Sequence, residues 1–247
     1  MDQLPLLAFV TATFAFAGFV KGVIELGLPT IAVGILGLVM APAQAAALLV
    51  IPNLITNGWQ IATGPALKPI LRRLWPMLLT IGLGTWAGAG LLQQSKGGAA
   101  TLWLGLALIA YALVGLKAAS LRVPPAKEAW LGPLVGFVTG VVTAATGVFV
   151  LPAVPYLQAL GFDKDELVQA LGVSFIVSTL ALSFGLAGAG ALTLAVGWQS
   201  ALALLPALAG MAAGQAIRER ISPATFKRCF FGGLLMLGAY LCWRGLA

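Results

Sequence analysis

The sequence predicts an all-α polytopic membrane protein whose chain contains two pseudo-symmetric, inverted repeats. The first observation is composition: 60% of the 247 residues are hydrophobic and only 9% are charged, whereas an average soluble domain is about one quarter charged. The second is that apolar stretches of about 20 residues recur, which is the length needed to cross a hydrocarbon core. The third is that similar motifs occur in both halves. Because the apolar runs are continuous rather than alternating, an outer-membrane barrel is excluded.

Eight apolar segments follow one another, and two of them are interrupted. Loops rich in proline, glycine and charged residues separate them. The N-terminus lacks the basic region of a signal peptide, so we interpret it as part of the structure. The predicted segments are Leu4–Met40 with a break near Glu25, Gln44–Ala62, Leu74–Leu92, Thr101–Leu116, Trp130–Leu160 with a break near Thr146, Leu167–Leu186, Leu192–Ala216 and Phe230–Trp243.

The chain divides near Pro124 into a first transmembrane repeat, 1–122, and a second, 123–247. "GFVKGVIELGLP" from Gly18 is similar to "GFVTGVVTAATG" from Gly136, an offset of 118 residues. "IPNLITN" from Ile51 is similar to "VSFIVST" from Val173, an offset of 122 residues. Each half has one broken or re-entrant segment followed by three transmembrane helices, which is typical of duplicated transporters.

The basic residues indicate how the halves are oriented. If every segment crosses once and the N-terminus is inside, seven loop and tail Lys and Arg lie inside and six lie outside. If the interrupted segments enter and leave on the same side, eleven lie inside and only Lys96 and Arg244 lie outside. The positive-inside rule favours this second arrangement, which has inverted repeats, six full helices and both termini in the periplasm. Because the rule is statistical, eight ordinary spans stay open as an alternative.

Glycines and prolines mark the two interruptions. Glycine permits close helix packing and a change of chain direction, and proline suits the first turn of a new helix. We expect half-helices to begin near Leu28 and Gly147, with their positive ends toward the membrane interior. The two breaks are expected to face one another near the midplane. The predicted helix-break residues are Gly22, Gly27, Pro29, Gly140, Gly147 and Pro152.

Polar side chains gather around these breaks and form the predicted substrate-binding set. An oxyanion that loses its hydration shell needs hydrogen-bond donors, and an ionisable residue at membrane depth is functional by default. The set is Lys21, Glu25, Thr30, Asn53, Asn57, Gln60, Thr139, Thr143, Gln169, Ser174 and Ser178, with Thr56, Thr146 and Thr179 beside them.

Each member of this set also has a structural interpretation. Hydroxyls in membrane helices bond their own backbone, amides join neighbouring helices, and glycines serve packing. Lys21 could extend to the interface or be neutralised by Glu25, which lies one helical turn away. In our hypothesis Lys21 attracts the anion and Glu25 offsets its charge in the empty site.

Two long stretches carry a resemblance to a known family. "GFVKGVIELGLPTIAVGILGLVMAPAQAAALLVIPNLITNGWQ" and "GFVTGVVTAATGVFVLPAVPYLQALGFDKDELVQALGVSFIVSTLAL" resemble the two repeat motifs of the TauE/SafE family, the sulfite-exporter-like permeases of bacterial inner membranes. The resemblance covers almost the whole chain in the right order. It implies a multi-pass protein of the bacterial inner membrane that transports sulfite, sulfoacetate or other organosulfonates.

These observations favour a permease that works by alternating access. We expect coupling to a proton or ion gradient because the chain has no nucleotide-binding motif. The predicted partners are a small anionic solute and the lipid bilayer, with a homo-oligomer allowed and no nucleic acid, since the net charge of +7 suits loops at an anionic membrane surface. No cofactor or metal is expected. An anion channel and a non-catalytic membrane subunit stay open as alternatives. An enzyme is disfavoured because the chain has no His and no acidic pair in its apolar region.

Overall fold

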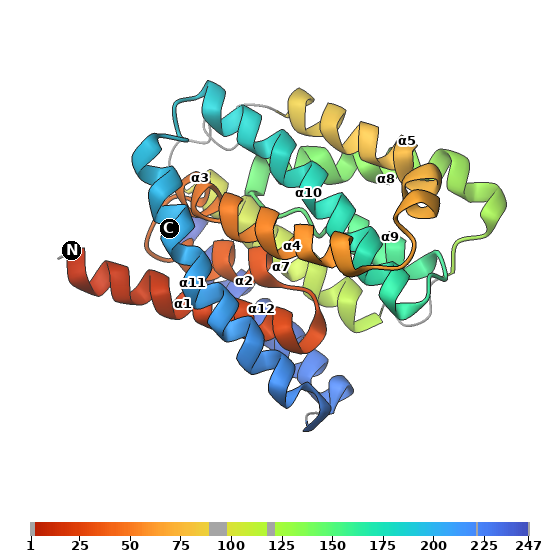
Figure 1. Cartoon of the computed structure of the whole chain (residues 1–247). Helices are drawn as coiled ribbons and strands as arrows, with labels where there is room; N and C mark the ends of the chain where they lie inside the picture. Colours follow the sequence, from red (N-terminus) through yellow and green to blue (C-terminus); the bar gives the residue numbers. More distant parts are fainter. Residues whose placement is uncertain (1–2, 89–97, 118–121, 221, 247) are drawn as a thin grey trace.

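The computed structural model describes residues 3–88, 98–117, 122–220 and 222–246. This part of the chain forms eleven α-helices and one 3₁₀ turn, without strands, which confirms the predicted all-α class (Figure 1). The first half contains α1 (Gln3–Ile24), α2 (Leu28–Leu36), α3 (Pro42–Leu48), α4 (Val50–Thr63), α5 (Leu67–Ala87) and α7 (Ala99–Lys117). The second contains α8 (Pro125–Thr146), α9 (Ala153–Ala159), α10 (Lys164–Gly188), α11 (Leu194–Ile217), η2 (Arg218–Arg220) and α12 (Pro223–Leu246).

Several of these helices are long and apolar enough to cross a membrane. Six qualify singly, namely α1, α7, α8, α10, α11 and α12, and α3 and α4 together form a seventh candidate that is bent by 48°. The 21-residue α5 is not among them, and its first turns carry Lys68, Arg72 and Arg73. The chain is therefore a multi-pass membrane protein, as its composition predicts. The division into repeats at residue 122 stays a prediction.

The first interrupted segment breaks where the sequence predicts. α1 has 22 residues, enough for about 33 Å at 1.5 Å per residue, so it is a full span rather than half of one. Residues 25–27 separate it from α2, which has nine residues and begins at Leu28 as expected. Pro29 lies in the first turn of α2, where no backbone N–H is needed. The interruption thus joins one long helix to one short helix.

The second interruption differs from its prediction, because no helix begins at Gly147. Gly147 has a φ of +73°, and its N–H donates to Thr143 O, so it ends α8 in the left-handed conformation that favours glycine. Residues 148–150 have no regular structure, and α9 begins only at Ala153, directly after Pro152. Gly147 is therefore a stop signal for α8 rather than a start signal for α9.

The segment Gln44–Ala62 was expected to be continuous, and this prediction is wrong, because the segment bends between α3 and α4. Pro52 has no N–H, so the carbonyl of Leu48 lacks its helical partner. Ser200 of α11 donates to Leu48 O at 2.8 Å and accepts from Ile51 N at 3.1 Å. A side chain from the second half thus satisfies the backbone that the bend leaves free.

Glycines bring α1 and α11 into backbone contact. A Cβ added to Gly18 would lie 2.0 Å from Ala207 O, and one added to Gly22 would lie 2.2 Å from Met211 O. Because the contact positions increase in residue number along both helices, α1 and α11 are parallel. Close packing of small residues in this manner is a common way to associate membrane helices.

The corresponding helices of the other half pack in the same way. In α8, a Cβ added to Gly136 would lie 2.3 Å from Met77 O, and one added to Gly140 would lie 2.3 Å from Ile81 O of α5. α8 and α5 are thus parallel as well. In the two halves α8 takes the place of α1, and α5 takes the place of α11. The motif glycines therefore serve helix packing in both pairs.

Contacts among residues near the ends of the helices define two ends of the bundle. At one end, Glu25 contacts Lys164 and Arg218, while Arg73 contacts Glu128 and Leu160 O. We call this the basic end. At the other end, Arg244 near the C-terminus donates to Leu38 O after α2, and both chain termini lie on the same side of Figure 1. We call this the terminal end.

Candidate functional site

Lys21 lies in the last turn of α1 and is almost completely buried, with 3% of its surface exposed. Its ammonium donates to Thr56 Oγ1 at 3.1 Å and to Asn57 Oδ1, both on α4. Within the described residues it forms no ion pair. A buried ammonium held only by neutral groups lacks the counter-charge that would offset its lost hydration.

The hydrogen bonds continue from α4 into the second half of the chain. Asn57 Nδ2 donates to Asn53 Oδ1 at 2.8 Å, Asn53 Nδ2 donates to Thr179 Oγ1 on α10, and Thr179 donates to Phe175 O at 2.7 Å. The three side chains are buried. Each donor points away from Lys21, so the network turns an acceptor, Asn57 Oδ1, toward the ammonium. α1, α4 and α10 thus meet in one polar line, which we call the Lys21 site.

The expected pairing of Lys21 with Glu25 is not present, which corrects the sequence hypothesis. The Glu25 carboxylate accepts from Arg218 and lies 4.0 Å from Lys164 Nζ. α1 ends at Ile24, and Glu25 has a φ of +64°, a conformation uncommon for a residue other than glycine. Its side chain therefore leaves the helix face that carries Lys21, and the (i, i+4) spacing no longer predicts a contact.

Two glutamines of the predicted set make tertiary contacts with the backbone. Gln169 of α10 donates to Ile61 O at 2.8 Å and accepts from Ala66 N at 2.7 Å, which holds α10 against the α4–α5 turn. Both ends of its amide are in use, so its interpretation as interhelical glue is the better one. Gln60 donates to Glu25 O at 3.3 Å and lies beside the first break.

The threonines of α8 and one serine of α10 bond their own helices. Thr139 donates to Val135 O, Thr143 to Thr139 O and Ser174 to Ala170 O, each four residues back along the chain. Thr146 behaves in the same way toward Val142 O. This is the structural alternative for such hydroxyls in membrane helices. None of these hydrogen bonds connects the four hydroxyls to the Lys21 site.

Thr30 and Ser178 are buried, and within the described residues their hydroxyls have no hydrogen-bond partner. Buried polar groups are normally paired, because an unpaired one loses its hydration without compensation. Thr30 lies in the first turn of α2, and Ser178 precedes the network residue Thr179. Both hydroxyls keep hydrogen-bonding capacity for a polar ligand. Tyr111 has the same property, but its ring packs against Phe230 and Phe231 instead.

The helix-break residues divide by role. Gly22 and Gly140 pack against α11 and α5, whereas Gly27, with a φ of +99°, precedes α2. Glu25 at the first break contacts residues of the basic end. The second break at Gly147 lies against Val33, Pro42 and Ala46. The second break thus contacts α2, the helix that follows the first break, and the face-to-face arrangement of the two breaks near the midplane stays a prediction.

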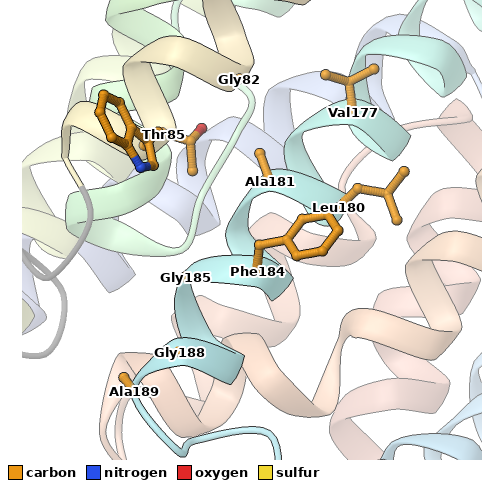
Figure 2. Close-up of a pocket in the computed structure, with 10 residues that line it drawn as sticks. Gly82, Thr85, Val177, Leu180, Ala181, Phe184, Gly185, Gly188 and Ala189 are labelled. Atoms are coloured by element: carbon orange, nitrogen blue, oxygen red, sulfur yellow. The ribbon is translucent and has the colours of Figure 1, made fainter.

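A separate, apolar groove of about 920 Å³ lies between α5 and α10. Figure 2 shows Val177, Ala181 and Phe184 of α10 along it, with Thr85 of α5 opposite. Phe184 and Trp86 are each 78% exposed, as expected of side chains that face lipid. A second groove, of about 630 Å³, lies among α1, α3 and α11. Neither groove includes Lys21.

Sequence reasoning missed two residues that support the site. Arg218 was counted only as a loop charge, although it binds the Glu25 carboxylate, and no local spacing connects residues so far apart in the chain. Ser200 was not singled out either. Its signal was Pro52, since a proline inside a span requires a neighbour to bond the freed carbonyl.

Comparison with known families gives one match. Residues 10–241, nearly the whole chain, match the model of the family described as "Sulfite exporter TauE/SafE". The matched range includes Lys21, both breaks and the α4–α10 network. No curated protein and no solved structure matched the chain in the corresponding comparisons.

Proposed function

The chain belongs to the TauE/SafE family of sulfite exporters, and from this premise we propose that it is a permease for small sulfur-containing anions in the bacterial inner membrane. Sulfite, sulfoacetate and other organosulfonates are the proposed solutes. The observation that carries the proposal is the Lys21 ammonium, which is buried in a membrane protein and, in the described part of the chain, is hydrogen-bonded by Thr56 and Asn57 alone. An ionisable residue at this depth marks a solute pathway by default.

An oxyanion suits this environment for three reasons. Its negative charge supplies the counter-charge that the buried ammonium lacks. Its oxygens accept hydrogen bonds from the ammonium, and such bonds are stronger because the partners are ionised. The Asn57 amide can rotate so that its NH₂ group, rather than its oxygen, faces the bound anion. Asn53 and Thr179 would then adjust with Asn57 and connect the site to α10.

Alternating access between inverted repeats is part of the proposal. Two parallel helix pairs support it. α1 of the first half packs against α11 of the second, and α8 of the second half packs against α5 of the first in the same way. α1 runs toward the basic end, where Glu25 lies, whereas α8 begins there, near Glu128. Opposite directions of equivalent helices are what an inverted repeat requires. We further propose that the basic end is cytoplasmic, following the eleven-to-two distribution of Lys and Arg.

Labelling of single-cysteine variants tests this topology. Cysteines placed at Lys68 and at Arg228 should react with an impermeant thiol reagent only from the cytoplasmic side. Cys229 and Cys242 would first be replaced by serine. Reaction of the two positions from opposite sides of the membrane would overturn the inverted arrangement.

Transport by the purified protein in proteoliposomes tests the function itself. Lys21→Gln should reduce the flux of labelled sulfoacetate about tenfold or more, equal to at least about 1.4 kcal/mol of lost interaction. Lys127→Gln is the matched control, because Lys127 is exposed on α8 and its charge change is the same. An imposed proton or ion gradient should drive uptake, as we propose for this permease. Equal flux in wild type and Lys21→Gln would contradict the proposed role of Lys21.

A further inference from the structure

A cluster of three charged groups lies next to the Lys21 site at the basic end. Glu25 stands in the break after α1, Lys164 begins α10, and Arg218 follows the end of α11. Both cations approach the same carboxylate oxygen, Glu25 Oε1. Since Lys164 and Arg218 belong to the second half, the carboxylate ties the first break to two elements of the other half.

The cluster covers the Lys21 site from the basic end. Glu25 N donates to Lys21 O at 2.8 Å, so Glu25 follows Lys21 by one helical turn. Gln60 follows Thr56 by one turn on α4, and its amide donates to Glu25 O at 3.3 Å. The layer of Glu25, Gln60 and Arg218 therefore lies between the Lys21 site and the end of the bundle where α1 and α4 terminate.

Solvent exposure differs sharply between the charged cluster and the Lys21 site. The side chains of Lys164 and Arg218 are 66% and 34% exposed, whereas Lys21 is buried. Within this cluster two cations share one carboxylate, so displacement of Glu25 would leave both cations free to bind an anion. Glu25 is also the one described residue other than glycine with a positive φ, so its position depends on the contacts that hold it.

We propose that Glu25 is a displaceable plug over the Lys21 site, and that an entering small oxyanion opens the plug by replacing the Glu25 carboxylate on Arg218 and Lys164. This inference rests on the proposed function. A sulfonate or sulfite group presents oxygen acceptors similar to those of a carboxylate, and a guanidinium binds either. Once displaced, Glu25 no longer fixes the break to α10 and α11, and the anion can move one turn deeper to Lys21.

The test uses a thiol beside Lys21 as a reporter of access. Thr56→Cys is made in a background with Cys229→Ser and Cys242→Ser, and an impermeant maleimide is added from the basic end in membrane vesicles of known orientation. With the plug intact, labelling should be slow. Glu25→Gln and Arg218→Gln should each accelerate it about tenfold or more by shifting the population toward the open form. Methanesulfonate, which does not react with maleimide, should accelerate labelling only when both Glu25 and Arg218 are present.

A matched control exists at the same end of the bundle. Glu128→Gln breaks the Arg73–Glu128 pair, whose closest atoms are 2.6 Å apart, without touching the α1–α2 break, and should leave the labelling rate unchanged. Unchanged labelling in Glu25→Gln and Arg218→Gln, or equal acceleration by Glu128→Gln, would overturn the plug. Absence of any methanesulfonate effect would overturn displacement by the anion. If only one of the two plug variants folds, that variant alone decides the first question.

Binding measured on the same preparations separates this inference from the proposed function. Loss of sulfonate affinity in Lys21→Gln together with unchanged labelling in Glu25→Gln would reject the plug and keep the permease site. Accelerated labelling in Glu25→Gln together with unchanged affinity in Lys21→Gln would reject Lys21 as the anion site.

Discussion

The two motif regions have the same packing but different chemistry. Gly22 of α1 and Gly140 of α8, 118 residues apart in the chain, both press against the backbone of a parallel partner helix. At the same offset, Lys21 corresponds to Thr139 and Glu25 to Thr143. Lys21 and Glu25 contact α4, α10 and η2, whereas the two threonines bond the backbone of α8. The glycine scaffold is thus common to both halves, and the charged groups occur only in the first.

The following spans show a second difference of the same kind. Thr56 corresponds to Ser178 and Asn57 to Thr179, each at an offset of 122 residues. Thr56 accepts from Lys21, whereas Ser178, whose half has a threonine in place of the lysine, has no partner in the described structure. The Lys21 site is therefore an asymmetric feature of a fold whose packing is alike in the two halves.

The largest expected loss of stability comes from substituting the glycines that pack α1 against α11 and α8 against α5. Gly22→Ala and Gly140→Ala should each destabilise the protein by about 1–3 kcal/mol, because the added Cβ meets backbone atoms that cannot move aside easily. Thermal unfolding in detergent would measure both. Gly82→Ala is the control, since its Cβ would have no neighbour within 4 Å. A large effect in only one of the two motif glycines would break the equivalence of the halves.

A smaller effect is expected at the bend between α3 and α4. Ser200→Ala leaves Leu48 O and Ile51 N without their partner, which should cost about 1–2 kcal/mol, since water can replace part of the lost hydrogen bonding. Ser174→Ala should cost less than about 0.5 kcal/mol, because that hydroxyl only bonds its own helix. The same unfolding assay compares them, and equal costs would remove the role assigned to Ser200.

The smallest expected effects have opposite signs. Thr56→Val removes an acceptor from the Lys21 ammonium and should destabilise the protein by about 1 kcal/mol. Ser178→Ala removes a buried hydroxyl without a described partner, and should be neutral or slightly stabilising. Differential unfolding of the two variants gives the comparison. Destabilisation by Ser178→Ala would show that its hydroxyl has a partner in the folded protein.

Much of the fold follows from the sequence because hydrophobic length and glycine or proline punctuation act locally. The long apolar helices and the break at Glu25 were predicted in this way. The start of α5 was not, because "LKPILRR" reads as a loop by its charges, although Leu67–Ala87 is one helix. The bend before Val50 was not predicted either, since it depends on Ser200, a residue about 150 positions away along the chain.

The candidate site was predictable in its members but not in its connections. Lys21, Asn53 and Asn57 stood out because ionisable and amide groups are rare in apolar spans. The assignment of Glu25 to Lys21 failed because helical spacing applies only while the helix continues, and α1 ends at Ile24, between these two residues. Arg218 could be found only once α1 and α11 were known to lie in parallel.

Calorimetric titration of sulfoacetate tests most directly the claim that the first half alone carries the anion site. Wild type, Lys21→Gln and Thr139→Val would be compared under identical conditions, since Lys21 and Thr139 occupy corresponding positions. The account predicts that Lys21→Gln weakens binding about tenfold or more, or abolishes it, and that Thr139→Val binds like wild type within about twofold. Unchanged affinity in Lys21→Gln, or an equal loss in Thr139→Val, would contradict it.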